Sequence, residues 1–328
     1  MTNNKYTVGG LFSGIGGIEK AFEQAKYEVK WAIENDKNCN LVYKLNFPNH
    51  HLIDKDVMDY KDYISSLDKV DVLTAGFPCQ AFSIAGYRKG FKDERGNLFF
   101  SITKFIKYLK PRAILLENVK NLENHDDGNT FRIIKKELTD LGYIVHYKVM
   151  NTCDYTDIPQ NRERIFIIAF LYKKHSEAFK FPNKFDQRKL KPIHKFFVPD
   201  EQVDNKFDYN DFYDIKKLRK IMDDINTLYQ YRRTDPRKNM SNMCPALTAN
   251  MGTGGHNVPL RLVKINTDGT KIIRKLTPKE CFSFQGLKSL KLPSNISDTQ
   301  LYKQAGNSVT VPLVKKLAVS IKKALDID

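Results

Sequence analysis

Three adjoining segments at the start of the chain restrict the folds that it can adopt. Residues 6–12 form an apolar run typical of a strand, residues 13–17 contain three glycines and predict a tight turn, and Ile18, Ala21, Phe22 and Ala25 recur at helical spacing. Glycines in such a turn let a ligand approach the backbone closely and leave free amides at the start of the helix. The sequence therefore predicts a strand, a glycine loop and a helix at a ligand-binding edge.

Alternating strand and helix patterns continue to about residue 170 and favour a mostly parallel, doubly wound, Rossmann-like α/β sheet. Apolar strands are expected at 29–33, 70–75, 113–116, 143–149 and 165–169, with helices at 102–109 and 131–141. Periodicity is weak from 172 to 245, which predicts a smaller, mostly irregular or β domain. A last helix with core spacing from Val314 to Leu325 is expected to pack against the first sheet.

The positive charge is concentrated in the second half of the chain. Residues 171–300 contain 25 Lys and Arg against 14 Asp and Glu, whereas residues 1–170 contain 24 against 22. A near-neutral body joined to a strongly basic segment is typical of a protein that binds a polyanion, above all nucleic acid. A lysine-rich proteome is the alternative source of this charge.

The cysteines, histidines and apolar segments argue against several other classes. Five cysteines without a Cys-x-x-Cys pair and seven histidines without ligand spacing indicate neither a disulfide framework nor a metal site. No apolar run is long enough to span a membrane, and the N-terminus lacks the apolar core of a signal peptide. We therefore expect a soluble, cytoplasmic protein with no membrane partner.

Acidic residues follow two early strands. Glu34 ends the strand at 29–33, twenty residues after Gly14, where it can accept both ribose hydroxyls of a nucleoside. Asp56 follows residues 51–53 and can accept the exocyclic amine of an adenine. The glycine loop has no glycine at the usual distance of the third glycine in a dinucleotide fingerprint, which favours a smaller nucleoside such as S-adenosylmethionine.

A cysteine and a carboxylate follow two further strands. The strand at 70–75 leads to Pro78-Cys79, where the proline stiffens the turn that holds the sulfur. The strand at 113–116 ends at Glu117, at the carboxyl edge where α/β sheets bind ligands. Residues 84–96 are basic and glycine-bracketed, as in a mobile loop that closes over a charged ligand. The local alternatives are a small buried cysteine and a solvated helix cap.

Two arginines, Arg162 and Arg164, open the strand at 165–169. Alternate residues of a strand share one face, so both can reach an anionic or carbonyl-bearing ligand. The alternative is a pair of surface ion pairs, with Glu163 as partner. A cysteine, a carboxylate and two arginines beside a nucleoside site suggest cytosine chemistry, because a thiolate that adds to C6 while an acid contacts N3 makes C5 nucleophilic.

Segments along nearly the whole chain resemble, in order, the motifs of the DNA (cytosine-5)-methyltransferase family. Residues 76–83 resemble its nucleophile motif, Glu117-Asn118-Val119 its acid motif and residues 160–164 its arginine motif. Ala246-Leu247-Thr248 approximates the Thr-Leu pair of the recognition domain. Further matches are residues 12–17, 95–99, 274–281, 285–286 and 306–309.

The resemblance implies domains and site residues. Residues 1–180 are expected to form the catalytic S-adenosylmethionine-binding domain, 181–300 a DNA-binding target-recognition domain, and 301–328 a helix returning to the catalytic domain. The implied catalytic residues are Cys79, Glu117, Arg162 and Arg164; the cofactor residues are Phe12, Gly14, Gly16, Gly17, Glu34, Asp56, Val57, Pro78, Asn307 and Ser308; the DNA contacts are Gln80, Ser83, Arg88, Lys89, Thr248, Gly254 and Gly255.

We therefore expect a sequence-specific enzyme that methylates C5 of a flipped-out cytosine in duplex DNA, converts S-adenosylmethionine to S-adenosylhomocysteine and uses no metal. It is expected to be a monomer in the bacterial cytoplasm, associated with the nucleoid, that protects host DNA beside a restriction endonuclease without stable contact. The alternatives are a tRNA cytosine-5 methyltransferase and a catalytically idle DNA-binding relative. The basic segment 171–300 favours duplex DNA, and the presence of all the catalytic residues favours an active enzyme.

Overall fold

The computed structural model describes residues 5–78, 98–210, 215–232, 235–252 and 258–327. The chain divides into two units. The first contains Met1–Met150, Glu163–Asn183 and Val311–Asp328, and the second contains Asn151–Arg162 and Lys184–Thr310. Each unit therefore combines segments that are distant in sequence. Among the described residues, no helix has both the length and the apolar character needed to cross a membrane.

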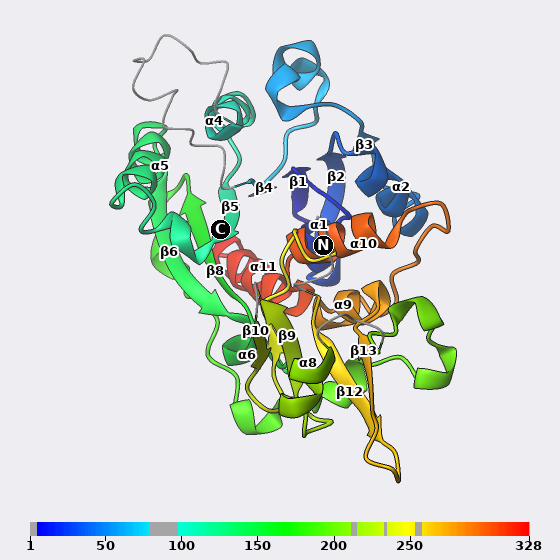
Figure 1. Cartoon of the computed structure of the whole chain (residues 1–328). Coiled ribbons are helices and arrows are strands. Elements are labelled where there is room, and N and C mark those ends of the chain that lie inside the picture. The colour runs from blue at the N-terminus through cyan, green and yellow to red at the C-terminus, as the bar shows by residue number, and fades with distance from the viewer. Residues whose placement is uncertain (1–4, 79–97, 211–214, 233–234, 253–257, 328) are drawn as a thin grey trace. The chain divides into compact units, whose positions relative to one another are not determined.

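A seven-stranded sheet forms the centre of the first unit (Figure 1). Its order is β3-β2-β1-β4-β5-β8-β6; the first five strands pair in parallel, and β8 runs antiparallel to β5. The mostly parallel, Rossmann-like sheet predicted from the sequence is confirmed. The strands are β1 (Thr7–Leu11), β2 (Glu28–Ile33), β3 (Leu52–Ile53), β4 (Val72–Gly76), β5 (Ala113–Val119), β6 (Ile144–Asn151) and β8 (Glu163–Phe170).

Helices cover both faces of this sheet because strand residues alternate between the faces. Leu11, Leu73 and Leu116 point to one face, where they share a buried apolar cluster with Phe105 of α4 and Ile134 of α5. The helices of the first unit are α1 (Gly17–Gln24), α2 (Lys37–Asn46), α4 (Leu98–Leu109), α5 (Asn129–Asp140), α7 (Lys173–Ala178) and α11 (Val311–Leu325), with 3-10 turns at Val57–Asp62, Ile64–Ser66 and Lys120–Leu122.

Helix α1 covers the other face. Gly10 of β1 points away from the Leu11 side, and a Cβ atom built on it would lie 1.9 Å from Oε1 of Glu19 in α1. Only glycine leaves room for this buried side chain, so Gly10 sets the close approach of α1 to the sheet.

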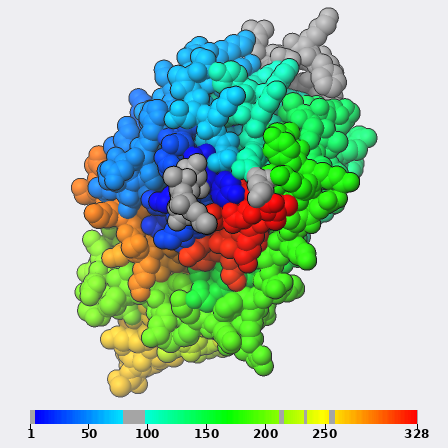
Figure 2. All heavy atoms as spheres, turned by 180° about the vertical axis from the view of Figure 1, so that it is seen from behind, coloured from blue at the N-terminus to red at the C-terminus, as the bar shows by residue number. Residues whose placement is uncertain are grey.

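The C-terminal helix α11 packs against α1. The hydroxyl of Tyr27, just after α1, donates a hydrogen bond of 3.1 Å to the carbonyl oxygen of Ala318. Figure 2 shows this C-terminal segment in red beside the N-terminal segment in blue. The expected last helix is therefore present, and its apolar stripe is buried in the first unit.

The second unit has a smaller antiparallel sheet with the order β10-β9-β12-β13. Tyr229, Leu262 and Ile273 share its apolar cluster with Leu218 of α8. Two very short strands, β7 and β11, pair in parallel and form a separate sheet. The elements are α6 (Thr152–Tyr155), β7 (Gln160–Asn161), α8 (Ile215–Ile221), β9 (Leu228–Arg232), β10 (Asp235–Lys238), β11 (Cys244–Pro245), β12 (Leu260–Ile265), β13 (Lys271–Lys275), α9 (Pro278–Phe284) and α10 (Asp298–Asn307), with 3-10 turns at Gln187–Lys189, Ile193–Phe196, Asp200–Gln202 and Asn205–Phe207.

A buried ion pair ties β13 to the start of α9 within the second unit. Nη2 of Arg274 lies 2.7 Å from Oε1 of Glu280, and Nε of Arg274 lies 2.8 Å from Oδ1 of Asp200. Glu280 also completes a capping box with Thr277, the N-cap residue of α9. These bonds satisfy a charge pair that would be costly to bury alone.

Candidate active site

A cavity of about 180 Å³ lies at the carboxyl ends of β1, β2 and β3 in the first unit. Five of the predicted cofactor residues line it: Phe12, Glu34, Asp56, Val57 and Pro78. Four more lining residues were not predicted: Ile33, Asn35, Lys55 and Leu98. Ile33, Asn35 and Lys55 adjoin Glu34 or Asp56 in sequence, so they could have been found as neighbours of the predicted acids. Leu98 is the first residue of α4, and no predicted acid adjoins it in sequence.

The glycine loop is tied to the end of β2 by Glu34. The amide of Gly14 donates to Oε2 of Glu34 at 2.8 Å, and the amides of Asn35 and Asp36 donate to Oε1 at 2.9 and 2.8 Å. Gly14 and Gly16 have φ values of 54° and 86°, the left-handed region that favours glycine. Because each carboxylate oxygen has two acceptor sites, Oε2 of Glu34 keeps capacity for a ribose hydroxyl.

Gly17, the remaining glycine of the loop, begins α1, and Gly16 is the N-cap residue of that helix. The amide of Gly16 donates to the carbonyl oxygen of Ser13 at 2.9 Å, which closes the turn before the helix. The loop therefore has the conformation expected from the sequence.

Asp56 is oriented by its own turn and by a neighbour. Oδ1 of Asp56 accepts from the amide of Met58 at 2.8 Å, and Oδ2 accepts from Nδ2 of Asn35 at 2.7 Å. The hydroxyl of Tyr63 donates to the carbonyl oxygen of Asp56 at 2.7 Å. Burial raises the pKa of Tyr63, and the charge of Asp56 acts in the same direction, so this hydroxyl keeps its proton.

Glu117 lies next to the end of β4. The parallel register of β4 and β5 pairs Gly76 with Glu117, and Nδ2 of Asn118 donates to the carbonyl oxygen of Phe77 at 2.9 Å. The backbone that runs on to Cys79 is therefore anchored to the strand that carries the carboxylate. Cys79 itself lies outside the described residues, as do the predicted DNA contacts Gln80, Ser83, Arg88 and Lys89.

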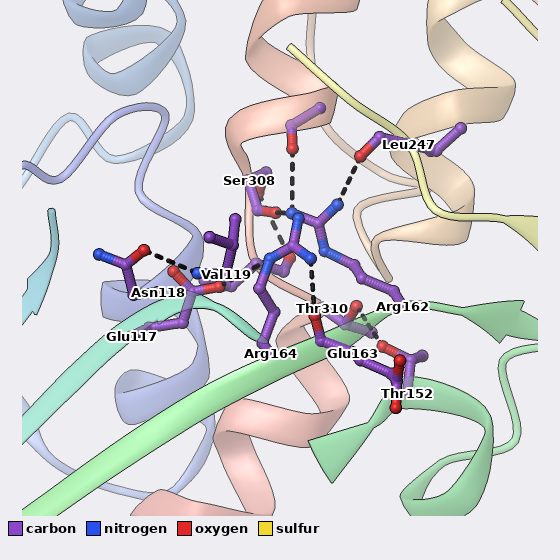
Figure 3. A network of polar contacts seen from close by, with 12 residues as sticks. Glu117, Asn118, Val119, Thr152, Arg162, Glu163, Arg164, Leu247, Ser308 and Thr310 are labelled. Carbon is purple, nitrogen blue, oxygen red and sulfur yellow. Dashed lines mark hydrogen bonds and ion pairs between the residues drawn. The ribbon is translucent and has the colours of Figure 1, made fainter. Parts of the chain in front are cut away.

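Arg164 holds the carboxylate of Glu117, as Figure 3 shows. Nε of Arg164 lies 3.2 Å from Oε1 of Glu117, and both side chains are largely buried. Burial lowers the pKa of Arg164 and the charge of Glu117 opposes this, so the guanidinium stays protonated. The carboxylate of Glu163 pairs with Lys120 at 2.9 Å, so the alternative in which Arg164 forms a surface pair with that carboxylate is wrong.

Arg162 lies in the second unit and is almost fully buried. Its guanidinium donates to three backbone carbonyl oxygens: Nη1 to Leu247 at 2.6 Å, and Nη2 to Gly306 at 2.9 Å and Ser308 at 2.7 Å (Figure 3). These carbonyl groups belong to the protein itself, so the predicted contact of Arg162 with a ligand stays a prediction. A surface ion pair with Glu163 is not what the structure shows.

The remaining predicted residues of the second unit are mixed in exposure. Asn307 ends α10 and is exposed, whereas Ser308 is buried. Thr248 is exposed, and its hydroxyl donates to Oδ1 of Asn250 at 2.7 Å. Gly254 and Gly255 lie outside the described residues. Within the described part of the chain, no group of three or more metal-ligating side chains is found.

Comparisons with known proteins identify the family of this chain. A family model described as C-5 cytosine-specific DNA methylase matches residues 6–323. The Type II methyltransferase M.Bsp6I of Bacillus sp. (strain RFL6) is 46% identical over 324 residues, covering 97% of this chain and 99% of that protein. M.HhaI of Haemophilus parahaemolyticus is 33% identical over 331 residues, covering 96% and 94%.

Solved structures show the same fold at lower identity. The Dnmt2 methyltransferase of S. pombe superposes with a TM-score of 0.71 at 19% identity, over 99% of this chain and all of that one. The methyltransferase EhMeth of Entamoeba histolytica gives 0.73 at 19% identity, over 98% and 99%. With a family model spanning almost every residue and relatives matched end to end, the chain belongs to the C-5 cytosine-specific DNA methylases and is a DNA (cytosine-5) methyltransferase.

Proposed function

We propose that this enzyme methylates one cytosine within a specific sequence of duplex DNA, by covalent catalysis through Cys79, as the modification enzyme of a restriction–modification system. The observation that carries the mechanism is the bond between Arg164 and Glu117 at 3.2 Å. It fixes a carboxylate beside the end of β4, three residues before Cys79. The type II names of the relatives support the restriction–modification role.

Family membership implies that the enzyme depends on S-adenosylmethionine and acts on DNA. The cavity of the first unit suits a nucleoside, because Glu34 and Asp56 offer oriented acceptors and Phe12 and Pro78 offer apolar surface. S-adenosylmethionine bound there would supply an electrophilic methyl group. Asn307 and Ser308 stay predicted contacts of the same cofactor.

Three of the four predicted catalytic side chains have a defined part in the proposed mechanism; Arg162 has none, because its guanidinium is bound to backbone carbonyl oxygens. The thiolate of Cys79 adds to C6 of the cytosine, which places electron density on C5, while Glu117 carries a proton to N3 and Arg164 holds the carbonyl edge of the base. After methylation the proton on C5 leaves to water or a nearby base, the C6–S bond breaks, and the thiolate is restored. Glu117 takes back the proton of N3 in the same step.

The target base has to leave the duplex before the thiolate can reach C6. Flipping costs a few kcal/mol for unstacking and unpairing. Contacts between the basic segment 171–300 and DNA phosphates would offset this cost and make binding fall steeply with salt. We therefore expect the dissociation constant for plasmid DNA to rise strongly between low and physiological salt.

Bisulfite sequencing of plasmid DNA after incubation with the enzyme and S-adenosylmethionine tests the proposal. We expect full methylation of one cytosine in one short sequence and none elsewhere. Cys79→Ala is expected to abolish methylation and the covalent adduct with a 5-fluorocytosine duplex. The control Cys39→Ala, which deletes the thiol of a residue within α2, should keep both methylation and the adduct. Undiminished methylation by the Cys79→Ala enzyme would refute the mechanism.

The remaining proposals concern substrate class, assembly and setting. An assay with labelled cofactor, run separately on plasmid DNA and on tRNA, distinguishes a DNA methyltransferase from a tRNA methyltransferase. Label that enters tRNA alone would support only the tRNA enzyme. We propose a monomer of 38.0 kDa, which light scattering measures directly. We also propose that it works in the cytoplasm on nucleoid DNA, and that a cognate endonuclease cuts the same site without a stable complex; co-purification of the two would contradict this.

A further inference from the structure

Arg162 joins two segments of the second unit that are far apart in the sequence. Its guanidinium binds the carbonyl oxygen of Leu247 on one side and those of Gly306 and Ser308 on the other, at 2.6 to 2.9 Å. Hydrogen bonds from a charged donor are shorter and stronger than those between neutral groups. The rigid, planar guanidinium of Arg162 therefore binds both segments at once, as the dashed lines from Arg162 in Figure 3 show.

The two segments also touch directly through their backbones. A Cβ atom built on Gly306 would lie 2.2 Å from the carbonyl carbon of Thr248, 2.3 Å from its oxygen and 2.5 Å from the amide nitrogen of Ala249. Only a glycine at 306 permits this approach, so a displacement of either segment must move the other.

Arg162 is itself anchored at both ends of its backbone. Its amide donates to Oδ1 of Asn151 at 2.8 Å, and its carbonyl oxygen accepts from the amide of Thr152 at 3.0 Å. The hydroxyls of Thr152 and Thr310 lie 2.9 Å apart. The guanidinium thus projects from a fixed backbone, and it cannot follow one of its carbonyl partners away from the others without losing bonds.

We propose that Arg162 is a positioning residue that couples the binding of target DNA to the binding of cofactor. This inference rests on the proposed function and on contacts expected from the sequence, in which Thr248 binds DNA and Asn307 and Ser308 bind S-adenosylmethionine. DNA that orders the segment at Leu247–Thr248 also orders Gly306–Ser308, because both segments bind the same guanidinium. Linkage requires that the cofactor raise the affinity for DNA by the same factor by which DNA raises the affinity for the cofactor.

The coupling is measured as a ratio of two dissociation constants for S-adenosylhomocysteine, determined by calorimetry. One titration is made without DNA and one with a saturating duplex that carries the sequence mapped by bisulfite sequencing. We expect the duplex to tighten binding by about fivefold or more in the natural enzyme. In the Arg162→Lys variant the ratio is expected to lie within about twofold of unity, because the single nitrogen of an ammonium group lacks the planar fork of donors with which the guanidinium reaches carbonyls on two sides.

A matched control is Arg188→Lys, which makes the same replacement at an exposed arginine of the same unit and should keep the ratio of the natural enzyme. A second measurement needs no variant: S-adenosylhomocysteine alone should slow hydrogen exchange of the backbone amides at 247–251. If Arg162→Lys fails to fold, this exchange result decides, since protection supports the coupling and its absence overturns it.

Two results of the titrations would also overturn the proposal. The first is a ratio near one in the natural enzyme, and the second is a ratio in Arg162→Lys equal to that of Arg188→Lys. A failure of the proposed function shows differently, as absence of any methylated cytosine in the bisulfite map of the natural enzyme.

Discussion

Replacing Glu19 with glutamine is expected to remove a strong pH dependence from the stability of this enzyme. Glu19 lies in the first turn of α1 and is fully buried against Gly10. Among the described residues, no hydrogen-bond partner reaches its Oε2 atom. An ionised carboxylate is poorly accommodated in such a place.

The size of the effect follows from the pKa of this side chain. Burial raises the pKa of Glu19 from 4.5 to about 7; the hydroxyl of Ser13 opposes the rise, and the charge of Glu34 adds to it. Each pH unit of difference between the folded and unfolded chain corresponds to about 1.4 kcal/mol, so the full difference amounts to about 3 kcal/mol.

The sign is set by which state loses its proton first. Below pH 4.5 Glu19 is protonated in both states and contributes no pH dependence. Between pH 4.5 and 7 the unfolded chain ionises while the folded chain keeps the proton, so the free energy of unfolding falls as pH rises. Above pH 7 the loss is complete and constant.

Urea unfolding of the natural enzyme and of Glu19→Gln at intervals from pH 5 to 8.5 measures the effect. Groups that titrate in both proteins cancel when the free energy of unfolding of the natural enzyme is subtracted from that of the variant. As the pH rises over this range, this difference should change in favour of the variant by about 2 to 3 kcal/mol. Glu201→Gln, at an exposed position, serves as a control and should follow the natural enzyme. Parallel curves for the natural enzyme and Glu19→Gln would refute the reasoning.

Three further changes test other parts of the structure. Gly9→Ala would place a Cβ atom 2.3 Å from the ring of Trp31 and should lower stability by about 1 to 3 kcal/mol in thermal unfolding; an unchanged melting temperature would contradict this packing. Arg274→Met leaves Glu280 buried without its partner and should cost about 3 to 5 kcal/mol in urea unfolding, with part recovered by adding Glu280→Leu; a cost below about 1 kcal/mol would show that the pair is not buried as described. Glu34→Ala should raise KM for S-adenosylmethionine about tenfold or more while kcat at saturation changes little, and an equal loss in kcat would place Glu34 in the chemistry instead.

The acidic cavity residues could be predicted because their positions follow from local patterns. Glu34 directly follows β2 and Asp56 lies three residues after the end of β3, and the carboxyl ends of parallel strands meet at one edge of a sheet. The same logic brings Asn35 and Lys55 into the cavity, since each neighbours a predicted acid. Phe12, Val57 and Pro78 were predicted from the family resemblance, and Leu98 was not predicted.

The partners of Arg162 could not be predicted in the same way. They are backbone carbonyl oxygens at 247, 306 and 308, and every residue has such a group, so side-chain chemistry gives no signal. The position of Asn151–Arg162 in the second unit is equally hidden, because it depends on tertiary contacts of a segment lying between two strands of the first. The close approach at Gly306 is visible only as a glycine within a motif.

The direction of β8 explains why an arginine at the start of one strand meets a carboxylate near the end of another. In the antiparallel register Arg164 stands opposite Val119 and Phe166 opposite Glu117, so Arg164 is the diagonal neighbour of Glu117 on the same face. A parallel β8 would begin at the opposite edge of the sheet, and the seven residues of β5 span roughly 20 Å at the usual rise. Arg164 can therefore reach the carboxylate of Glu117 only because this strand reverses direction.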